Sequence, residues 1–256
     1  MIRNIFRPKW LLFIVLLIAV IFFIANAFQA PQLRCALVHF SNFKQVSDKI
    51  YVSPELDKST CDSLRLLVTK AIQRNKEFWL TQPEEFTLIF CSYDSELERY
   101  TGVKNAQTLS HITPFETYIV LGPRGYNLDI ISHEISHSVL FQVVGYKNIA
   151  HKIPVWFNEG LALQVDYRKD MMDGQVENNY KTNPEYLDGI SDFTNFHTSS
   201  WSETRKHYLA SRYELKHWLD QNHSKLECFL VGIAEQPDFI KYYSDYTLTT
   251  NSSEVN

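Results

Sequence analysis

The sequence predicts an α+β domain in which strands and one long helix come first and further helices follow. Apolar residues recur with helical spacing over 60–80, two short apolar runs at 86–91 and 118–121 are typical of strands, and helical patterns dominate after residue 127. The chain has 256 residues and is 45% hydrophobic, as globular proteins are. About 225 residues follow the N-terminal segment, enough for one domain or two small packed lobes.

Residues 10–28 are predicted to form a transmembrane signal anchor, because residues 10–25 are uninterrupted apolar. A helix of this length spans about the 30 Å of a hydrocarbon core. Basic residues precede the segment and only Arg34 follows it closely, so the positive-inside rule places residues 1–9 in the cytoplasm and the rest across the membrane. The preceding basic residues are Arg3, Arg7 and Lys9.

A cleaved signal peptide is the alternative interpretation, because Ala25-Asn26-Ala27 has the small-x-small pattern of a signal-peptidase site. The apolar run is longer than the ~7–15 residues of a signal peptide, which favours the anchor. A buried core helix is a third interpretation. The signal anchor predicts a single-pass membrane protein, and the cleaved signal peptide predicts an exported one. Both place residues 29–246 outside the cytoplasm, on the periplasmic side of the inner membrane in a bacterium. Residues 247–256 are a polar tail.

The first part of the domain is predicted to contain an extended segment with one strand, followed by a long helix. Residues 29–58 are expected to be extended, with a strand at 49–52. An amphipathic helix over 60–80 follows, and Ser59 or Thr60 would cap its N-terminus.

Two more strands, Phe86–Cys91 and Tyr118–Leu121, are predicted before the next helix. That helix begins at residue 127 or 129 and ends near Val144, with Gly145 as its C-cap. Another helix is expected over 155–167, where Pro154 suits the first turn. Residues 169–198 are polar and predicted to be irregular, and further helices are expected at 202–222, 225–234 and 237–243.

Four cysteines would form up to two disulfides in an exported domain, with three possible pairings. Buried free thiols are the alternative. The cysteines are widely spaced and lack a CxxC motif, so a cysteine zinc site is not expected. They are Cys35, Cys61, Cys91 and Cys228.

The net charge of −4 and the absence of a basic stripe exclude a nucleic-acid-binding protein as a first choice. No repeat with a period of 20–50 residues is present, which argues against solenoids and propellers. The expected partners are a peptide or protein substrate and, through the N-terminal helix, a membrane. The sequence predicts neither the natural substrate nor the oligomeric state.

His133-Glu134-Ile135-Ser136-His137 is an HExxH motif and carries the predicted chemistry. Residues four apart share one face of a helix, so both imidazoles can reach one metal ion. The surrounding sequence contains neither Pro nor Gly and is compatible with a helix. Zinc with three protein ligands keeps a position open, polarises a carbonyl and activates a water, whose proton Glu134 would accept.

The next helix begins with Trp156-Phe157-Asn158-Glu159-Gly160. With HExxH, this W-x-x-E-G pattern resembles the gluzincin metallopeptidases, particularly the peptidase MA-like family and, more distantly, the M1 aminopeptidases. The metzincin pattern is excluded, because Leu140 and Val143 stand where it requires Gly and His.

The resemblance implies that Glu159 is the third ligand of a single Zn²⁺ ion. It also implies a zincin-like fold, with a small mixed sheet and an active-site helix followed by a helical C-terminal lobe. Between His137 and Glu159 lie 21 residues, slightly more than in the M1 group. The motif that captures a substrate amino terminus in M1 enzymes has no counterpart, so an endopeptidase is expected. Tyr118–Leu121 would be the sheet edge on which an extended substrate lies.

Gluzincins also use a Tyr or His from a later helix to stabilise the oxyanion. Tyr208, in Tyr208-Leu-Ala-Ser211, best matches the family pattern, with His207 and Tyr213 as alternatives. Asp166 or Asp129 would orient a zinc-ligating histidine. The remaining histidines are expected at the surface: His39, His111, His151, His197, His217 and His223.

These observations predict a membrane-anchored zinc metallopeptidase in which Glu134 activates water. One alternative is a metallohydrolase that acts on a non-peptide amide or ester, because the zinc chemistry is shared. Another is a catalytically inactive zinc-binding envelope protein. Glu134 argues against that second alternative, because a structural site does not need this carboxylate.

Overall fold

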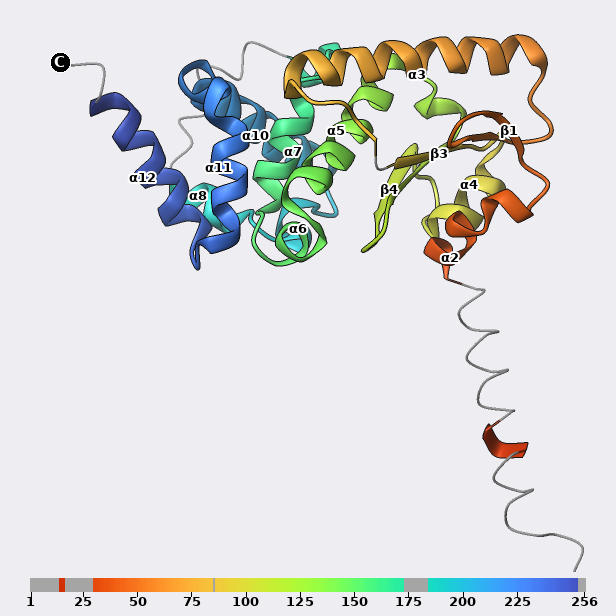
Figure 1. The fold of residues 1–256 in the computed structure, drawn as a ribbon, viewed down its shortest axis with the longest axis horizontal. Helices are drawn as coiled ribbons and strands as arrows, with labels where there is room; N and C mark the ends of the chain where they lie inside the picture. The colour runs from red at the N-terminus through yellow and green to blue at the C-terminus, as the bar shows by residue number, and fades with distance from the viewer. Residues whose placement is uncertain (1–13, 17–29, 85, 173–183, 253–256) are drawn as a thin grey trace, which may run out of the picture.

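A computed structural model describes residues 14–16, 30–84, 86–172 and 184–252 (Figure 1). The fold combines helices with one five-stranded mixed sheet, in the strand order β1-β2-β3-β5-β4. The inner strands β2, β3 and β5 are parallel, whereas β1 and β4 are antiparallel to their neighbours. The strands are β1 (Lys44–Ser47), β2 (Ile50–Val52), β3 (Phe86–Phe90), β4 (Thr108–Ile112) and β5 (Thr117–Leu121).

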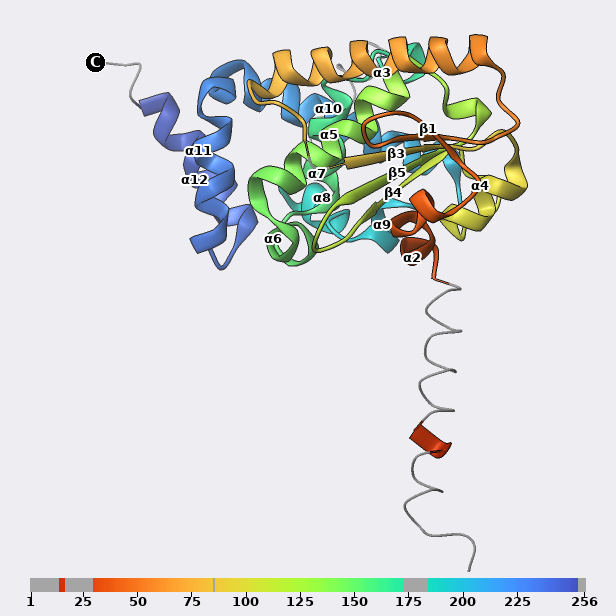
Figure 2. The same cartoon turned by 45° about the vertical axis from the view of Figure 1, so that its right-hand side comes forward.

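Side chains of the central strands alternate between two hydrophobic cores, as the two-residue period of a strand requires. In β3, Leu88 and Phe90 belong to the larger core, whereas Ile89 belongs to the smaller one. Helices cover both faces of the sheet (Figure 2). The larger core is covered by α3 (Lys58–Trp79) and α5 (Leu128–Val144), and the smaller core by α2 (Pro31–Ala36) and α4 (Asp94–Thr101).

The prediction of a transmembrane helix over residues 10–28 is corrected. Within the described part of the chain, no helix has both the length and the apolar composition needed to cross a membrane. Of the predicted segment, the structure describes only residues 14–16, which are helical, and the others lie outside the described residues. The predicted placement as a single-pass membrane protein with an extracytoplasmic domain is withdrawn with it.

The segment predicted as extended instead contains the short helix α2 and the 3₁₀ turn Val38–Phe40. The disulfide prediction is also wrong, because all four cysteines are free. Three are buried in hydrophobic cores, whereas Cys228 is exposed. Burial raises the pKa of Cys35 to about 12, so this thiol stays protonated near neutral pH.

The predicted long helix is confirmed as α3, although it begins two residues earlier than expected. Its N-cap is Asp57, which accepts a hydrogen bond from the Thr60 backbone N–H at 2.8 Å. Leu80, with φ of 57°, ends the helix. The predicted caps Ser59 and Thr60 both lie within its first turn.

Helix α5 carries the HExxH motif and crosses the interior of the protein, with 13 of its 17 residues buried. Asn127 caps its N-terminus through the backbone N–H groups of Asp129 and Ile130, and Gly145 follows its last residue, as predicted. Its buried polar groups have partners on α3: Trp79 Nε1 donates to Ser136 Oγ at 3.0 Å. This packing fixes the axis on which the two histidines stand.

Helix α7 (Val155–Leu163) carries the W-x-x-E-G motif and ends four residues before the predicted limit. It packs closely against α10 (Trp201–Asn222) at Gly160. A Cβ atom on Gly160 would lie 2.7 Å from the backbone oxygen of Ser211, nearer than a side chain can approach. The glycine of the motif therefore sets the distance between these two helices.

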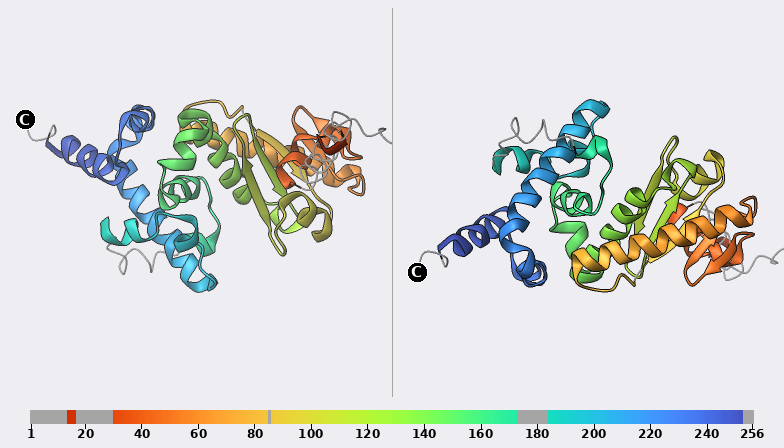
Figure 3. Two further views of the ribbon diagram at one scale, coloured as in Figure 1. Left: turned by 90° about the horizontal axis from the view of Figure 1, so that it is seen from below. Right: turned by 90° about the horizontal axis from the view of Figure 1, so that it is seen from above.

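The C-terminal helices form a lobe at the end of the molecule opposite β1 and α2 (Figures 1 and 3). An aromatic cluster holds them together, in which Trp156 and Phe157 of α7 contact Tyr243 of the last helix. Within the segment predicted as irregular, residues 173–183 lie outside the described residues. The remaining helices are α6 (Tyr146–His151), α8 (Pro184–Gly189), α9 (Phe193–Phe196), α11 (Leu226–Gly232) and α12 (Phe239–Ser252), and α12 extends into the predicted polar tail.

Strand β4 was not predicted, yet it forms the edge of the sheet beside α5. The strand predicted as the substrate edge, Tyr118–Leu121, is confirmed as a strand, but it lies inside the sheet between β3 and β4. Thr108–Ile112 therefore takes the place expected of Tyr118–Leu121.

Candidate metal centre

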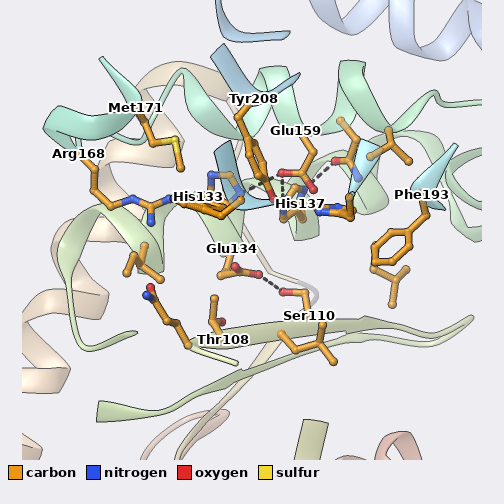
Figure 4. Close-up of a pocket in the computed structure, with 18 residues that line it drawn as sticks. Thr108, Ser110, His133, Glu134, His137, Glu159, Arg168, Met171, Phe193 and Tyr208 are labelled. Carbon is orange, nitrogen blue, oxygen red and sulfur yellow. Dashed lines mark hydrogen bonds and ion pairs between the residues drawn. The ribbon is translucent and has the colours of Figure 1, made fainter. Parts of the chain in front are cut away.

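Two neighbouring helices bring His133, His137 and Glu159 together. The histidines lie one turn apart on α5, and Glu159 projects from α7 toward them (Figure 4). Glu159 Oε2 is 3.3 Å from His133 Nε2 and 3.7 Å from His137 Nε2. One possible ligand atom from each residue lies within 4.8 Å of the others. The group can therefore hold one metal ion.

The Glu159 carboxylate supports this interpretation. Its Oε2 atom is buried and has no hydrogen-bond partner among the described residues, although burying a carboxylate oxygen without a partner is costly. A tetrahedral ion with ligand bonds near 2.05 Å separates its ligand atoms by about 3.3 Å, close to the two distances measured here. Two imidazoles and one carboxylate also form a donor set that suits zinc and similar divalent transition metals.

The other ring nitrogen of each histidine faces an oxygen atom of a neighbouring side chain. His133 Nδ1 lies 3.4 Å from Asp166 Oδ2, and Asp166 is fully buried. His137 Nδ1 donates to Asn158 Oδ1 at 2.8 Å, because an amide oxygen can only accept. When a metal is bound, protons on Nδ1 would leave the Nε2 lone pairs directed at the metal position.

The turn that carries Asp166 is fixed by arginines. Arg168 binds both carboxylate oxygens, with its Nε 3.0 Å from each and its Nη2 2.5 Å from Oδ2. Arg74 donates to the Val165 carbonyl at 2.9 Å, and Arg212 donates to the carbonyl of Asp166 at 2.8 Å. Asp166 therefore stands in a rigid position behind His133.

Neighbouring charges strongly shift the pKa values of His133 and Glu159. Burial by itself would lower the pKa of His133, but the carboxylates of Asp166 and Glu159 raise it to about 10. Burial raises the pKa of Glu159, yet the imidazoles of His137 and His133 lower it to about 2. Without a metal, His133 is therefore protonated near neutral pH, and a divalent cation would replace that proton.

Glu134 lies beside the metal group and faces the sheet edge. Its Oε2 accepts a hydrogen bond from Ser110 Oγ at 2.5 Å, which links α5 to β4 (Figure 4). The side chain does not join the metal-binding group, as expected for a carboxylate that acts on water.

A cleft of about 430 Å³ runs between β4 and the helices that carry the metal group. Tyr208, on α10, lines it with its ring directed toward the histidines and Glu159 (Figure 4). Its hydroxyl makes no hydrogen bond with the described residues. Burial and the negative charges of Glu159 and Glu134 raise the pKa of Tyr208, so it remains a hydrogen-bond donor.

The structure distinguishes among the residues that were predicted as alternatives for stabilising the oxyanion or orienting a histidine. His207 is buried against the Phe196 carbonyl, and neither His207 nor Tyr213 lines the cleft. Asp129 forms an ion pair with Arg74 at 2.6 Å instead of orienting a histidine, so the Asp129 alternative is wrong, whereas Asp166 Oδ2 lies 3.4 Å from His133 Nδ1.

Two histidines expected at the surface are not there. His111 is buried and bonded to the Tyr100 carbonyl at 2.9 Å, and His197 lines the cleft. Burial lowers the pKa of His197, although the Glu159 charge opposes this. Three residues of the site were not predicted from the sequence: Ser110, Asn158 and His197. Only Asn158 gave a signal, because it stands next to Glu159 in the W-x-x-E-G motif.

No model of a known protein family matches the sequence, and no curated protein matches it. The fold and the site define a mixed α/β protein with a buried His-His-Glu group that can hold a metal ion.

Proposed function

We propose that this protein is a zinc metallopeptidase of the gluzincin type that cleaves peptide bonds inside a chain. The observation that carries the proposal is the position of Glu134. This carboxylate lies next to a His-His-Glu metal group without joining it, and it faces an open cleft. A purely structural metal site has no use for such a group.

A bound zinc ion would polarise the scissile carbonyl and lower the pKa of a water molecule toward 7. Glu134 takes the proton of the attacking water and delivers it to the leaving amine. The Tyr208 hydroxyl donates a hydrogen bond to the oxyanion that develops on the carbonyl.

The substrate backbone binds to β4 as an added strand. Among the described strands, none pairs with the outer edge of β4, so its outward N–H and C=O groups can bind an extended peptide. Thr108, Ser110 and Ile112 line the cleft along this edge. A peptide bound along this edge would run through the cleft, as the interior of a chain does.

The test combines metal content with activity in the full chain. The wild type should bind about one zinc per chain and cleave casein or members of a peptide library. Glu134→Gln should retain the zinc and lose the hydrolysis. Glu98→Gln, which changes an exposed carboxylate on α4, serves as the matched control and should remain active.

The proposal fails if zinc-loaded wild type and Glu134→Gln are equally inert toward broad peptide substrates. Turnover of amide or ester substrates without any peptide cleavage would instead assign the centre to a non-peptide hydrolase.

A further inference from the structure

Glu134 depends on a single neighbour. The residue is buried, and among the described residues the Ser110 hydroxyl is the one hydrogen-bond partner of its carboxylate. The bond reaches Oε2 at 2.5 Å, a short distance typical of a hydroxyl bound to an ionised carboxylate. Oε1 accepts no hydrogen bond from the described residues, and Glu134 lines the cleft. One carboxylate oxygen is thus held and the other is available.

The side chain of Ser110 points to the α5 side of the sheet. Ser110 is the central residue of β4 and pairs with Ile119 of β5. Its neighbour His111 points to the opposite face, where it is buried against the Tyr100 carbonyl. Because side chains alternate along a strand, the Ser110 hydroxyl can reach α5 only in this register.

The backbone of Ser110 faces away from β5. Gly122 N bonds to Gln107 O at one end of the ladder, and Thr113 N bonds to Glu116 O at the other. In an antiparallel pair, residues directed at the partner strand alternate with residues directed away from it. Positions 107, 109, 111 and 113 therefore bond to β5, and the N–H and C=O of Ser110 point to the free edge.

We propose that Ser110 is a positioning residue that holds the Glu134 carboxylate in its reactive orientation and ties it to the strand on which the substrate backbone binds. The inference rests on the function proposed above. Ser110 donates its hydroxyl hydrogen to Oε2 and so directs Oε1 toward the water. Its backbone N–H and C=O hydrogen-bond to the substrate backbone, so one residue positions both the general base and the scissile peptide bond.

The test uses Ser110→Ala in the zinc-loaded full chain, with Ser110→Thr as the conservative variant. Ser63→Ala is the matched control, because Ser63 is exposed on α3 and its hydroxyl donates to the Ser59 backbone oxygen. We expect Ser110→Ala to keep its zinc and its unfolding temperature, to lower kcat roughly tenfold or more, and to leave KM within about twofold. Ser110→Thr should recover most of the kcat, and Ser63→Ala should match the wild type.

A second measurement does not depend on activity. In crystal structures of the zinc-loaded proteins, the Glu134 carboxylate should occupy one orientation in the wild type and in Ser110→Thr, and lose it in Ser110→Ala. An unchanged carboxylate or an unchanged kcat in Ser110→Ala would overturn the inference. An inert wild type whose Glu134 orientation still requires Ser110 would overturn the proposed peptidase function and leave the positioning role of Ser110 intact.

Discussion

Asp166 Oδ2 lies 3.4 Å from Nδ1 of His133, and the Asp166 side chain is completely buried. In a metal-loaded protein this contact would orient the His133 ring and make its Nε2 a better donor. Arg168 neutralises the carboxylate from its other side, which makes the burial tolerable.

Replacing Asp166 by Asn should therefore weaken zinc binding by about 10–100-fold, because the amide cannot supply the same charge to His133. Asp62→Asn is the matched control, since Asp62 is an exposed carboxylate on α3, 3.8 Å from Arg65. Competition with a chelator measures both affinities. Equal affinities in the two variants would contradict the role of Asp166.

Tyr208→Phe should lower kcat by about 10²-fold or more, because Tyr208 supplies the one phenol among the described residues that line the cleft. Zinc content and KM should change little, since Tyr208 is not part of the metal-binding group. Tyr213→Phe is the control, because Tyr213 lies on the same helix and does not line the cleft. If the two variants had the same kcat, another donor would be required, and His197 is the next cleft residue to replace.

The metal-free protein should lose stability as the pH rises. The folded-state pKa of His133 is about 10, above its ordinary value of 6.5, so its stabilising contribution is complete below pH 6.5 and disappears as the pH rises through 10. Glu159 behaves in the opposite sense. Its pKa of about 2 lies below 4.5, so its contribution is complete above pH 4.5 and disappears as the pH falls through 2.

Thermal unfolding of the chelator-treated protein between pH 6 and pH 10 measures the first effect. The unfolding temperature should fall over this range in the wild type and fall less in Asp166→Asn, which lacks one of the carboxylates that raise the pKa of His133. Saturation with zinc should remove most of the decline, because the metal replaces the proton. A flat profile in the metal-free wild type would contradict the assigned charges.

Gly160→Ala should destabilise the protein by roughly 1–3 kcal/mol, because the added methyl group overlaps the Ser211 backbone oxygen on α10. Gly189→Ala is the control, since nothing lies within 4 Å of a Cβ at that position. Urea unfolding compares the two. The first variant should also lose activity, because Glu159 and Tyr208 stand on the helices that would separate.

Long periodic patterns explain why much of the fold could be predicted. Helices α3 and α10 bury residues at helical spacing over at least four turns, and α5 is a long, mostly buried segment without Pro or Gly, so their sequences leave little choice. The metal-binding group could also be predicted from the sequence, because HExxH places two histidines on one helix face and Glu159 follows in a recognisable motif.

Short and half-buried elements escaped prediction for a physical reason. Helix α2 has six residues, too few for a periodic pattern, and β4 (TLSHI) has a half-buried, largely polar surface. Ser110 and His197 join the site through contacts between distant segments, which local patterns do not reveal. The order of β4 and β5 in the sheet likewise depends on tertiary packing, so the edge position was assigned to the wrong strand.

The burial of α5 has a consequence for the binding of a metal ion. A zinc finger orders its chain around the ion, whereas α5 is held by the apolar side chains packed around it and by hydrogen bonds from α3. We therefore expect α5 to fold without a metal ion. An ion that binds the His-His-Glu group would enter through the cleft along β4.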